Sequence, residues 1–334
     1  MRIGIVNDMP LAVKALRGAL ARAPEHQVIW VASTGTEAVQ RCREDTPDLL
    51  LMDLLMPEMD GVEATRQIMA ETPCAILIVT SDVERHVSRV FEAMGHGALD
   101  VVATPALGDA PLPDAATLLR KIHNLELLLG QKVARKALEP ILRESSSCRQ
   151  RLVVIGASAG GPASLVELLK QLPANFPAAI VLVQHVDETF AAGMAQWLAS
   201  ESPLPVRLAR AGDVPQPGSV LLAGSNDHLI LQRNGELTYN AEPSAHIYRP
   251  SIDVFFDSVV ANWKGDSIGV LLTGMGRDGA QGLLHMRQRG FLTIAQDQAS
   301  CAVYGMPKAA AQLDAASEIL PLAEIGRRLV ALFD

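Results

Sequence analysis

A single serine lies between glycines in the stretch VIGASAGGPASL, residues 154–165, directly after an apolar run. The pattern G-x-S-x-G is typical of the turn that carries the nucleophile of a serine hydrolase. A glycine-rich turn between a strand and a helix is also how many proteins hold nucleotide phosphates. Ser158 is therefore a candidate nucleophile, and the alternative is a spacer in a phosphate-binding loop.

A serine hydroxyl becomes a useful nucleophile only beside a positioned base, which a third group must orient. His185 ends the apolar run AAIVLVQH, so we expect it at the same sheet edge as Ser158. The other histidines of this half are less well placed, because His228 precedes a strand, His246 lies in a loop and His285 is inside a helical pattern. Position favours His185 as the base, and a structural histidine at a strand end is the alternative.

The carboxylate that orients the base should lie at the same edge of the sheet. Asp278 lies in the glycine-rich loop that follows the apolar run SIGVLLTG. Asp297, at the end of FLTIAQD, competes with it, and Asp187 beside the histidine is the third candidate. Position favours Asp278, while the sequence leaves the other two open.

The glycines of the serine loop have a predicted purpose. Gly156, Gly160 and Gly161 allow a tight turn and let a substrate approach the helix expected to begin near Pro162. Backbone N–H groups at such a helix start can stabilise the oxyanion of an acyl-transfer intermediate. We place Met275, in the loop TGMGRDG, on the same oxyanion and substrate side. The histidines are too scattered for a zinc-binding H-E-x-x-H helix, so we expect no cofactor for this chemistry.

Two other enzyme folds share part of this pattern. An α/β-hydrolase has the chain order serine, acid, histidine, which would require His285 from within a helix. A short-chain dehydrogenase would use Tyr304 and Lys308 on one helical face, yet Pro307 lies between them and is expected to open the helix instead. The G-x-G-x-x-G fingerprint is also absent. Both alternatives are disfavoured.

Polar side chains at the ends of apolar runs predict a second site in the first half of the chain. Asn7 and Asp8 end the first run, Asp53 the third, Thr80 the fourth and Thr104 the fifth. Carboxylates on neighbouring strands suit Mg²⁺, and a metal-neutralised carboxylate beside a hydroxyl can take up a phosphoryl group. The alternative is that the two aspartates are capping or turn residues.

These side chains depend on the elements that carry them. Short apolar runs alternate with helical patterns in both halves, which predicts two α/β domains, each with a mainly parallel sheet flanked by helices. We expect a flavodoxin-like first domain, and a doubly wound second domain with a β-hairpin at Asn234-Gly235. The predicted boundaries are 1–122 for the first domain, 123–149 for a polar, partly helical linker, and 150–334 for the second domain.

Composition narrows the class of protein. A chain of 334 residues favours two domains, and the net charge of -8 argues against nucleic acid or an anionic membrane as partner. The second half is acidic as well, so it is a poor DNA-binding module. The cysteines show no C-x-x-C spacing. Without a signal peptide or a long apolar run, we expect a cytoplasmic protein that does not insert into membranes.

The stretches IVND, LLLMDLLMPEMDG, ILIVTS and ATP resemble the landmarks of response-regulator receiver domains, from residue 1 to about 122. The resemblance implies that Asp53 is the phospho-acceptor, that Asp8 and Asp53 bind Mg²⁺, and that Thr80 is the switch hydroxyl. Two departures are expected to weaken the metal site and the switch: Asn7 replaces an acid, and Thr104 replaces the lysine that pairs with the phosphoryl group.

The motifs GAS-x-GG, QH, TGMG-x-DG and VYGMP behind a receiver resemble the chemotaxis response regulator methylesterases of the CheB type, and most of all the WspF-like branch. The resemblance implies a nucleophilic Ser158, His185 as general base and acid, and Asp278 as the orienting group. It also implies hydrolysis of glutamyl methyl esters on methyl-accepting chemoreceptors with release of methanol, and deamidation of receptor glutamines in some members. The implied partners are a chemoreceptor as substrate and a CheA-type histidine kinase as phosphodonor.

Departures and alternatives remain in this half too. Ala159 stands where the family usually has threonine, and QHVDET where it has Q-H-M-P, and we expect both at the rim that faces the receptor. The implied regulation is that the unphosphorylated receiver covers the serine edge and that phosphorylation of Asp53 opens it. The non-enzymatic alternative is a catalytically weak, receptor-docking response regulator.

Overall fold

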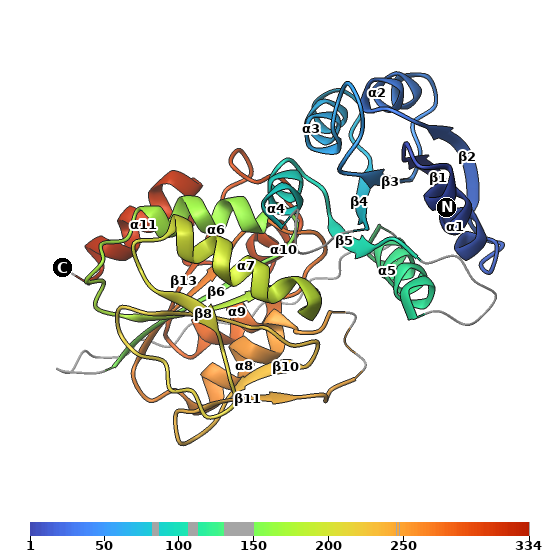
Figure 1. Ribbon diagram of the computed structural model, residues 1–334. Helices are drawn as coiled ribbons and strands as arrows, with labels where there is room; N and C mark the ends of the chain where they lie inside the picture. Colours follow the sequence, from blue (N-terminus) through green and yellow to red (C-terminus); the bar gives the residue numbers. More distant parts are fainter. Residues whose placement is uncertain (82–86, 106–112, 130–149, 245, 247, 334) are drawn as a thin grey trace. The chain divides into compact units, whose positions relative to one another are not determined.

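The computed structural model describes most of the chain, namely residues 1–81, 87–105, 113–129, 150–244, 246 and 248–333 (Figure 1). The chain divides into two compact units, Met1–Gln131 and Lys132–Asp334, which are described separately below. Most of the segment predicted as a linker, residues 130–149, lies outside the described residues.

The first unit is built on a sheet of five parallel strands in the order β2-β1-β3-β4-β5. This order is the flavodoxin-like one, which confirms the predicted fold of the first domain. The strands form where the sequence has near-continuous apolar runs, and β4 is buried along its whole length because helices cover both faces. Their bounds are β1 (Arg2–Val6), β2 (Gln27–Ala32), β3 (Leu49–Asp53), β4 (Ala75–Thr80) and β5 (Asp100–Ala103).

The helices of the first unit form two layers. α1 packs against α5, while α3 packs against both α2 and α4. Thr34 and Asp60 fix the starts of α2 and α3, because each side chain accepts a hydrogen bond from a backbone N–H of the first turn. The helix bounds are α1 (Pro10–Leu20), α2 (Gly35–Glu44), α3 (Gly61–Glu71), α4 (Val87–Gly95) and α5 (Pro113–Leu129). α5 thus extends into the segment expected to be the linker.

The second unit contains a sheet of seven strands in the order β14-β13-β12-β6-β7-β9-β8, with every pair parallel. The chain starts in the middle, at β6, and builds outward first through β7 and later through β12. Such a reversal opens a crevice at the carboxyl ends of the central strands. The bounds are β6 (Arg151–Ala157), β7 (Ala179–Gln184), β8 (Val206–Leu208), β9 (Val220–Leu222), β12 (Asp266–Leu271), β13 (Leu292–Gln296) and β14 (Glu318–Leu320).

Two helical layers cover this sheet as well. α6 packs against α7 and α11, and α9 packs against α8 and α10. Phe255 and Phe256 of α8 are fully buried in the core with Leu283 and Met286 of α9. The helix bounds are α6 (Gly161–Lys170), α7 (Glu188–Glu201), α8 (Ile252–Asn262), α9 (Ala280–Gln288), α10 (Met306–Gln312) and α11 (Leu322–Ala331).

The predicted hairpin is confirmed. β10 (His228–Leu231) and β11 (Leu237–Asn240) pair antiparallel, and β10 packs against α8. Gly235 lies in the connecting turn with φ of 86°, a conformation that favours glycine. The expectation of two α/β domains with parallel sheets flanked by helices is therefore confirmed throughout the described residues.

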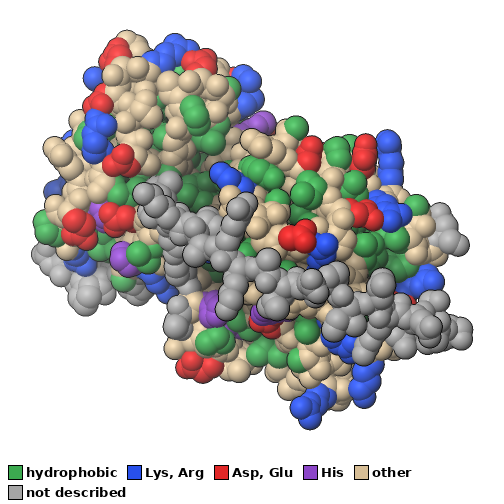
Figure 2. Space-filling model, turned by 180° about the vertical axis from the view of Figure 1, so that it is seen from behind, with side chains coloured by type: hydrophobic (Ala, Val, Ile, Leu, Met, Phe, Trp, Pro, Cys, Tyr) green, Lys and Arg blue, Asp and Glu red, His purple; other side chains and the backbone are tan. Residues whose placement is uncertain are grey.

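The surface carries charges of both signs. Figure 2 shows one face, on which Lys and Arg side chains lie singly or in small groups among Asp and Glu. A broad basic area, the usual mark of a nucleic-acid surface, is not seen among the described residues of this face. No helix in the described ranges is both long and apolar enough to cross a membrane.

Candidate active site

Ser158 directly follows β6 and begins the tight connection to α6. Its backbone N–H donates to the carbonyl of Thr273, with N and O 3.0 Å apart. Its own carbonyl accepts from the N–H of Gly161 at 2.7 Å and from Nε2 of Gln184 at 2.9 Å. The same Gln184 nitrogen also donates to the carbonyl of His185, so one buried amide ties together the backbones of the serine and the histidine.

The glycines of this connection serve different purposes. Gly160 has φ of 75°, and a Cβ there would lie 2.5 Å from the Cβ of Ala302. A Cβ on Gly161 would lie 2.1 Å from Oε1 of Gln184. Gly156 instead lies within β6, where a Cβ would meet the side chain of Ile252 at 2.4 Å. Gly160 and Gly161 therefore permit the turn, whereas Gly156 makes room for the start of α8.

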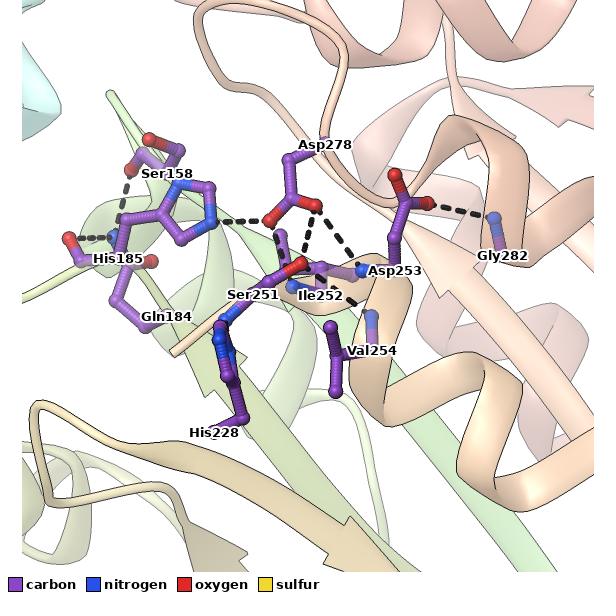
Figure 3. A network of polar contacts seen from close by, with 10 residues as sticks. All are labelled: Ser158, Gln184, His185, His228, Ser251, Ile252, Asp253, Val254, Asp278 and Gly282. Atoms are coloured by element: carbon purple, nitrogen blue, oxygen red, sulfur yellow. Dashed lines mark hydrogen bonds and ion pairs between the residues drawn. The ribbon is translucent and has the colours of Figure 1, made fainter. Parts of the chain in front are cut away.

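His185 follows β7, and Asp278 lies in the loop after β12, so both reach the edge where Ser158 stands. Nε2 of His185 lies 2.7 Å from Oδ2 of Asp278, and both side chains are buried. Figure 3 shows the imidazole between Ser158 and Asp278, with the second ring nitrogen on the side of Ser158. This nitrogen, Nδ1, has no hydrogen-bond partner among the described residues. The structure thus brings together the serine, histidine and aspartate that strand-end position favoured.

The N-terminus of α8 holds the Asp278 carboxylate. Oδ1 accepts hydrogen bonds from the hydroxyl of Ser251 at 2.8 Å and the N–H of Asp253 at 3.1 Å, and Oδ2 accepts from the N–H of Ile252 at 2.7 Å. Burial by itself would raise the pKa of Asp278, but its hydrogen bond with His185 and its hydrogen bonds from α8 outweigh this effect and lower the pKa. Asp278 therefore stays ionised beside the imidazole.

The other two candidate acids are engaged elsewhere. Asp187 caps α7, where its side chain accepts from the N–H of Thr189 at 3.1 Å. Asp297 accepts from the N–H of Ser300 at 3.0 Å in the turn after β13. Of the three acids, only Asp278 has a hydrogen bond to His185 within the described part of the chain.

Sequence reasoning missed the part played by His228. This buried histidine accepts the N–H of Ser251 on Nδ1 at 3.0 Å, so its proton is on Nε2, which donates to the carbonyl of Pro243 at 3.0 Å. Burial lowers the pKa of His228 and favours this neutral form. Because Ser251 caps α8 and also donates to Asp278, His228 supports the site through one intermediate residue. The S-x-D sequence at the start of the helix signals the cap, Ser251, but not the contact of Ser251 with His228.

Asp253 was also missed. Its side chain accepts from the N–H of Gly282 at 2.6 Å, which joins α8 to α9. Burial and the negative charge of Asp278 raise the pKa of Asp253 to about 8. The two neighbouring carboxylates therefore disfavour each other's ionisation, and the hydrogen bonds that Asp278 accepts favour the charge on Asp278. His285 makes an exposed pair with Asp257 and lies apart from this network.

The segment that contains the VYGMP motif lies beside the loop between β6 and α6, and Thr273 connects the two. Oγ1 of Thr273 donates to the carbonyl of Ala159 at 2.9 Å and accepts from the N–H of Val303 at 2.9 Å. Ala159 is fully buried, so the expectation that it lies at a receptor-facing rim is wrong. The N–H groups of Gly160 and Met275 have no hydrogen-bond acceptor in the described residues, unlike that of Gly161.

The polar residues of the first unit also meet at one sheet edge. Asn7, next to β1, donates from Nδ2 to Oδ2 of Asp53 at 2.8 Å, and its Oδ1 accepts from the N–H of Met9 at 2.8 Å. Thr80 is buried at the end of β4, and its carbonyl accepts from the N–H of Thr104 at 2.9 Å. Asp8 is exposed beside this cluster.

Comparisons with known proteins agree on both units. The family model "CheB methylesterase" matches residues 153–329, and "Response regulator receiver domain" matches residues 3–110. A Pseudomonas aeruginosa protein-glutamate methylesterase/protein-glutamine glutaminase is 69% identical over the full length of both chains. A Pseudomonas syringae relative of the same name is 67% identical and is covered to 99%. The crystal structure of the Thermotoga maritima CheB methylesterase catalytic domain matches with 37% identity and a TM-score of 0.53, covering 55% of this chain and 100% of that one.

Proposed function

This chain belongs to the CheB methylesterase family and carries a response-regulator receiver domain, and we propose that it is a phosphorylation-regulated protein-glutamate methylesterase that uses a Ser-His-Asp mechanism. The observation that carries the proposed mechanism is the His185 imidazole, which lies between Ser158 and Asp278 and is 2.7 Å from the carboxylate. The names of the relatives support a second activity, the deamidation of glutamine.

In the proposed first step, the Ser158 oxygen attacks the ester carbonyl carbon while Nδ1 of His185 takes the hydroxyl proton. The Nε2 proton stays on the side of Asp278, so a buried carboxylate stabilises the imidazolium. The tetrahedral intermediate expels methanol, which receives the proton from Nδ1, and an acyl-enzyme remains. Water, deprotonated by the same nitrogen, hydrolyses the acyl-enzyme to glutamate and restores the serine. With glutamine as substrate, ammonia leaves instead.

We assign the oxyanion to the N–H groups of Gly160 and Met275, which are unused among the described residues. The N–H of Gly161, expected from the sequence to contribute, instead donates to the carbonyl of Ser158 and shapes the turn. Donors that are fixed before the reaction cost no reorganisation when charge develops on the substrate oxygen.

For the receiver we propose Asp53 as phospho-acceptor and Thr80 as switch hydroxyl, with a CheA-type kinase as phosphodonor. The oxygen ligands of Asp8, just after β1, and of Asp53, at the end of the neighbouring strand β3, fit a hard cation. They would hold Mg²⁺, which neutralises charge during phosphoryl transfer. Asn7 offers no second negative charge, and its amide already binds Asp53 and Met9.

The proposed substrate is a methyl-accepting chemoreceptor, and the proposed division of labour follows the predicted boundaries. Residues 1–122 act as the receiver, 123–149 as the linker and 150–334 as the esterase domain. The receiver model matches within the first of these ranges and the esterase model within the last, which supports the division.

The test is methanol release from a methylated receptor by the wild type and by Ser158→Ala. We expect the variant to lose at least about a thousandfold in kcat/KM, because both acyl transfers need the hydroxyl. Ser200→Ala is the matched control, since Ser200 is exposed on α7 and its hydroxyl donates to the carbonyl of Trp197.

Activity that persists in Ser158→Ala would rule out the nucleophile. No methanol release from the wild type on any methylated receptor, with intact binding, would favour the receptor-docking alternative.

A further inference from the structure

Tyr248 lies against the face of the catalytic imidazole. Its ring centroid is 3.9 Å from that of His185, and the two ring planes differ by only 9°. Tyr248 precedes α8 in the chain, in the segment that connects β11 to this helix. We propose that Tyr248 is a positioning residue for His185, which fixes the plane of the imidazole and stabilises its cationic form during acyl transfer. The inference rests on the proposed role of His185 as base.

The hydrogen bonds alone leave the imidazole plane underdetermined. The bond from Nε2 to Asp278 fixes one edge of the ring, while Nδ1 has no partner among the described residues. A ring held by one edge can tilt about that bond and carry Nδ1 away from Ser158. A parallel aromatic face opposes this tilt, since a tilt of the imidazole out of its plane would drive one of its edges into the phenol ring.

The same contact favours the charge that forms in the reaction. His185 becomes an imidazolium when it takes the serine proton, and its side chain is only 7% exposed, so water solvates it poorly. The face of an aromatic ring attracts a cation, and the attraction grows where water is excluded. Tyr248 therefore adds to the stabilisation by Asp278, from a direction perpendicular to the hydrogen bond.

Hydrogen bonds hold the chain in place on both sides of Tyr248. Upstream, the carbonyl of Pro243 accepts from Nε2 of His228. Downstream, Arg249 donates to Asp227 at 2.8 Å, and Ser251 donates to Asp278. Of these contacts, the one from Ser251 also orients the catalytic acid.

The test compares Tyr248→Phe with Tyr248→Leu in steady-state methanol release by the full chain. The phenylalanine variant keeps the aromatic face, so we expect its kcat within about twofold of the wild type. The leucine variant should lose roughly 3- to 30-fold in kcat with KM little changed, which is the range of a partly to fully desolvated cation–π contact. Phe291→Leu is the control, because Phe291 is a partly buried aromatic that faces Arg289, not His185.

A second measurement reports the stack without turnover. In protein with ¹³C-labelled histidine rings, the ring current of Tyr248 should shift the His185 C–H resonances upfield in the wild type and in Tyr248→Phe, and this shift should disappear in Tyr248→Leu. Wild-type protein without the shift would overturn the stack itself, whatever Ser158→Ala shows.

The kinetic outcomes are equally decisive. An unchanged kcat in Tyr248→Leu would show that Tyr248 does not position His185. An increased kcat/KM would show instead that Tyr248 hinders access of the substrate to the site. A loss in Tyr248→Phe equal to that in the leucine variant would assign the effect to the hydroxyl. An effect confined to KM would make Tyr248 a substrate contact.

Discussion

At the scale of single residues, Asp278 combines two properties that oppose each other in a folded protein: it is buried, and it is charged. Hydrogen bonds from the first turn of α8 and from His185 replace the lost water, and together they lower its pKa. The carboxylate can therefore fix the His185 tautomer that leaves Nδ1 free to accept a proton.

Asp278→Asn should lower kcat about 10³- to 10⁴-fold with little change in KM, since an amide cannot hold the same tautomer or stabilise the imidazolium. The matched control is Asp297→Asn, because Asp297 competes by position but binds Ser300 instead. The measurement is the kcat and KM of methanol release by each variant. An Asp297→Asn loss as large as that of Asp278→Asn would contradict the assignment.

Position along the chain predicted Ser158, His185 and Asp278 because parallel strands deliver the residues after them to one edge. The sequence could not decide between the three acids, since that choice depends on which helix start each one faces. Asp187, for example, faces the start of α7 and caps that helix. The stacked Tyr248 was unpredictable for another reason: it approaches His185 through a loop, where neither strand nor helix periodicity constrains direction.

At the scale of elements, the start of α8 is where the supporting contacts converge. Ser251 caps the helix, its N–H donates to Nδ1 of His228, and its hydroxyl donates to Asp278. The contact needs His228 to be neutral, because a protonated ring would turn an N–H toward the N–H of Ser251. Sequence periodicity predicted α8 itself, but the partner of its cap lies at the start of β10 and required the tertiary structure.

Because burial lowers the pKa of His228, the folded state binds fewer protons than the unfolded state just below the ordinary histidine pKa of about 6.5. The stabilisation is complete above that pH and is lost as the pH falls toward the folded-state pKa. His228→Gln should therefore lower the free energy of unfolding by about 1–3 kcal/mol at pH 7.5, and by less at pH 5.5.

Thermal melting of the wild type and His228→Gln at both pH values measures this difference. His285→Gln is the control, because His285 forms an exposed pair with Asp257 that is expected to contribute about 0–1 kcal/mol. A His228→Gln penalty that is equal at the two pH values would show that the titration of His228 is not coupled to folding.

At the scale of the whole molecule, the chain joins two α/β units that each complete their own sheet. The alternation of apolar runs predicted both sheets. The alternation by itself does not give the strand orders, because strand pairing is decided by contacts between distant segments. The regulation that joins the two units is a separate question, since Asp53 and Ser158 belong to different sheets.

The proposed regulation makes a direct prediction about the receiver. If the unphosphorylated receiver restrains the esterase, removal of residues 1–145 should raise methanol release by about 5- to 150-fold, the range of a coupling of 1–3 kcal/mol between sites. We expect the truncated protein to fold, because the Thermotoga maritima catalytic domain is a separate chain that this one covers completely.

A small phosphodonor such as acetyl phosphate, with Mg²⁺, should raise the activity of the full chain in the same direction and should leave Asp53→Asn unchanged. The response should be smaller than the effect of truncation, because Asn7 and Thr104 stand where the family has an acid and a lysine.

Asn7→Asp restores one of the two missing charges, so it should increase the Mg²⁺-dependent response without altering the truncated protein. Equal activity after truncation would show that the receiver does not restrain the esterase, and lower activity would show that the receiver supports it.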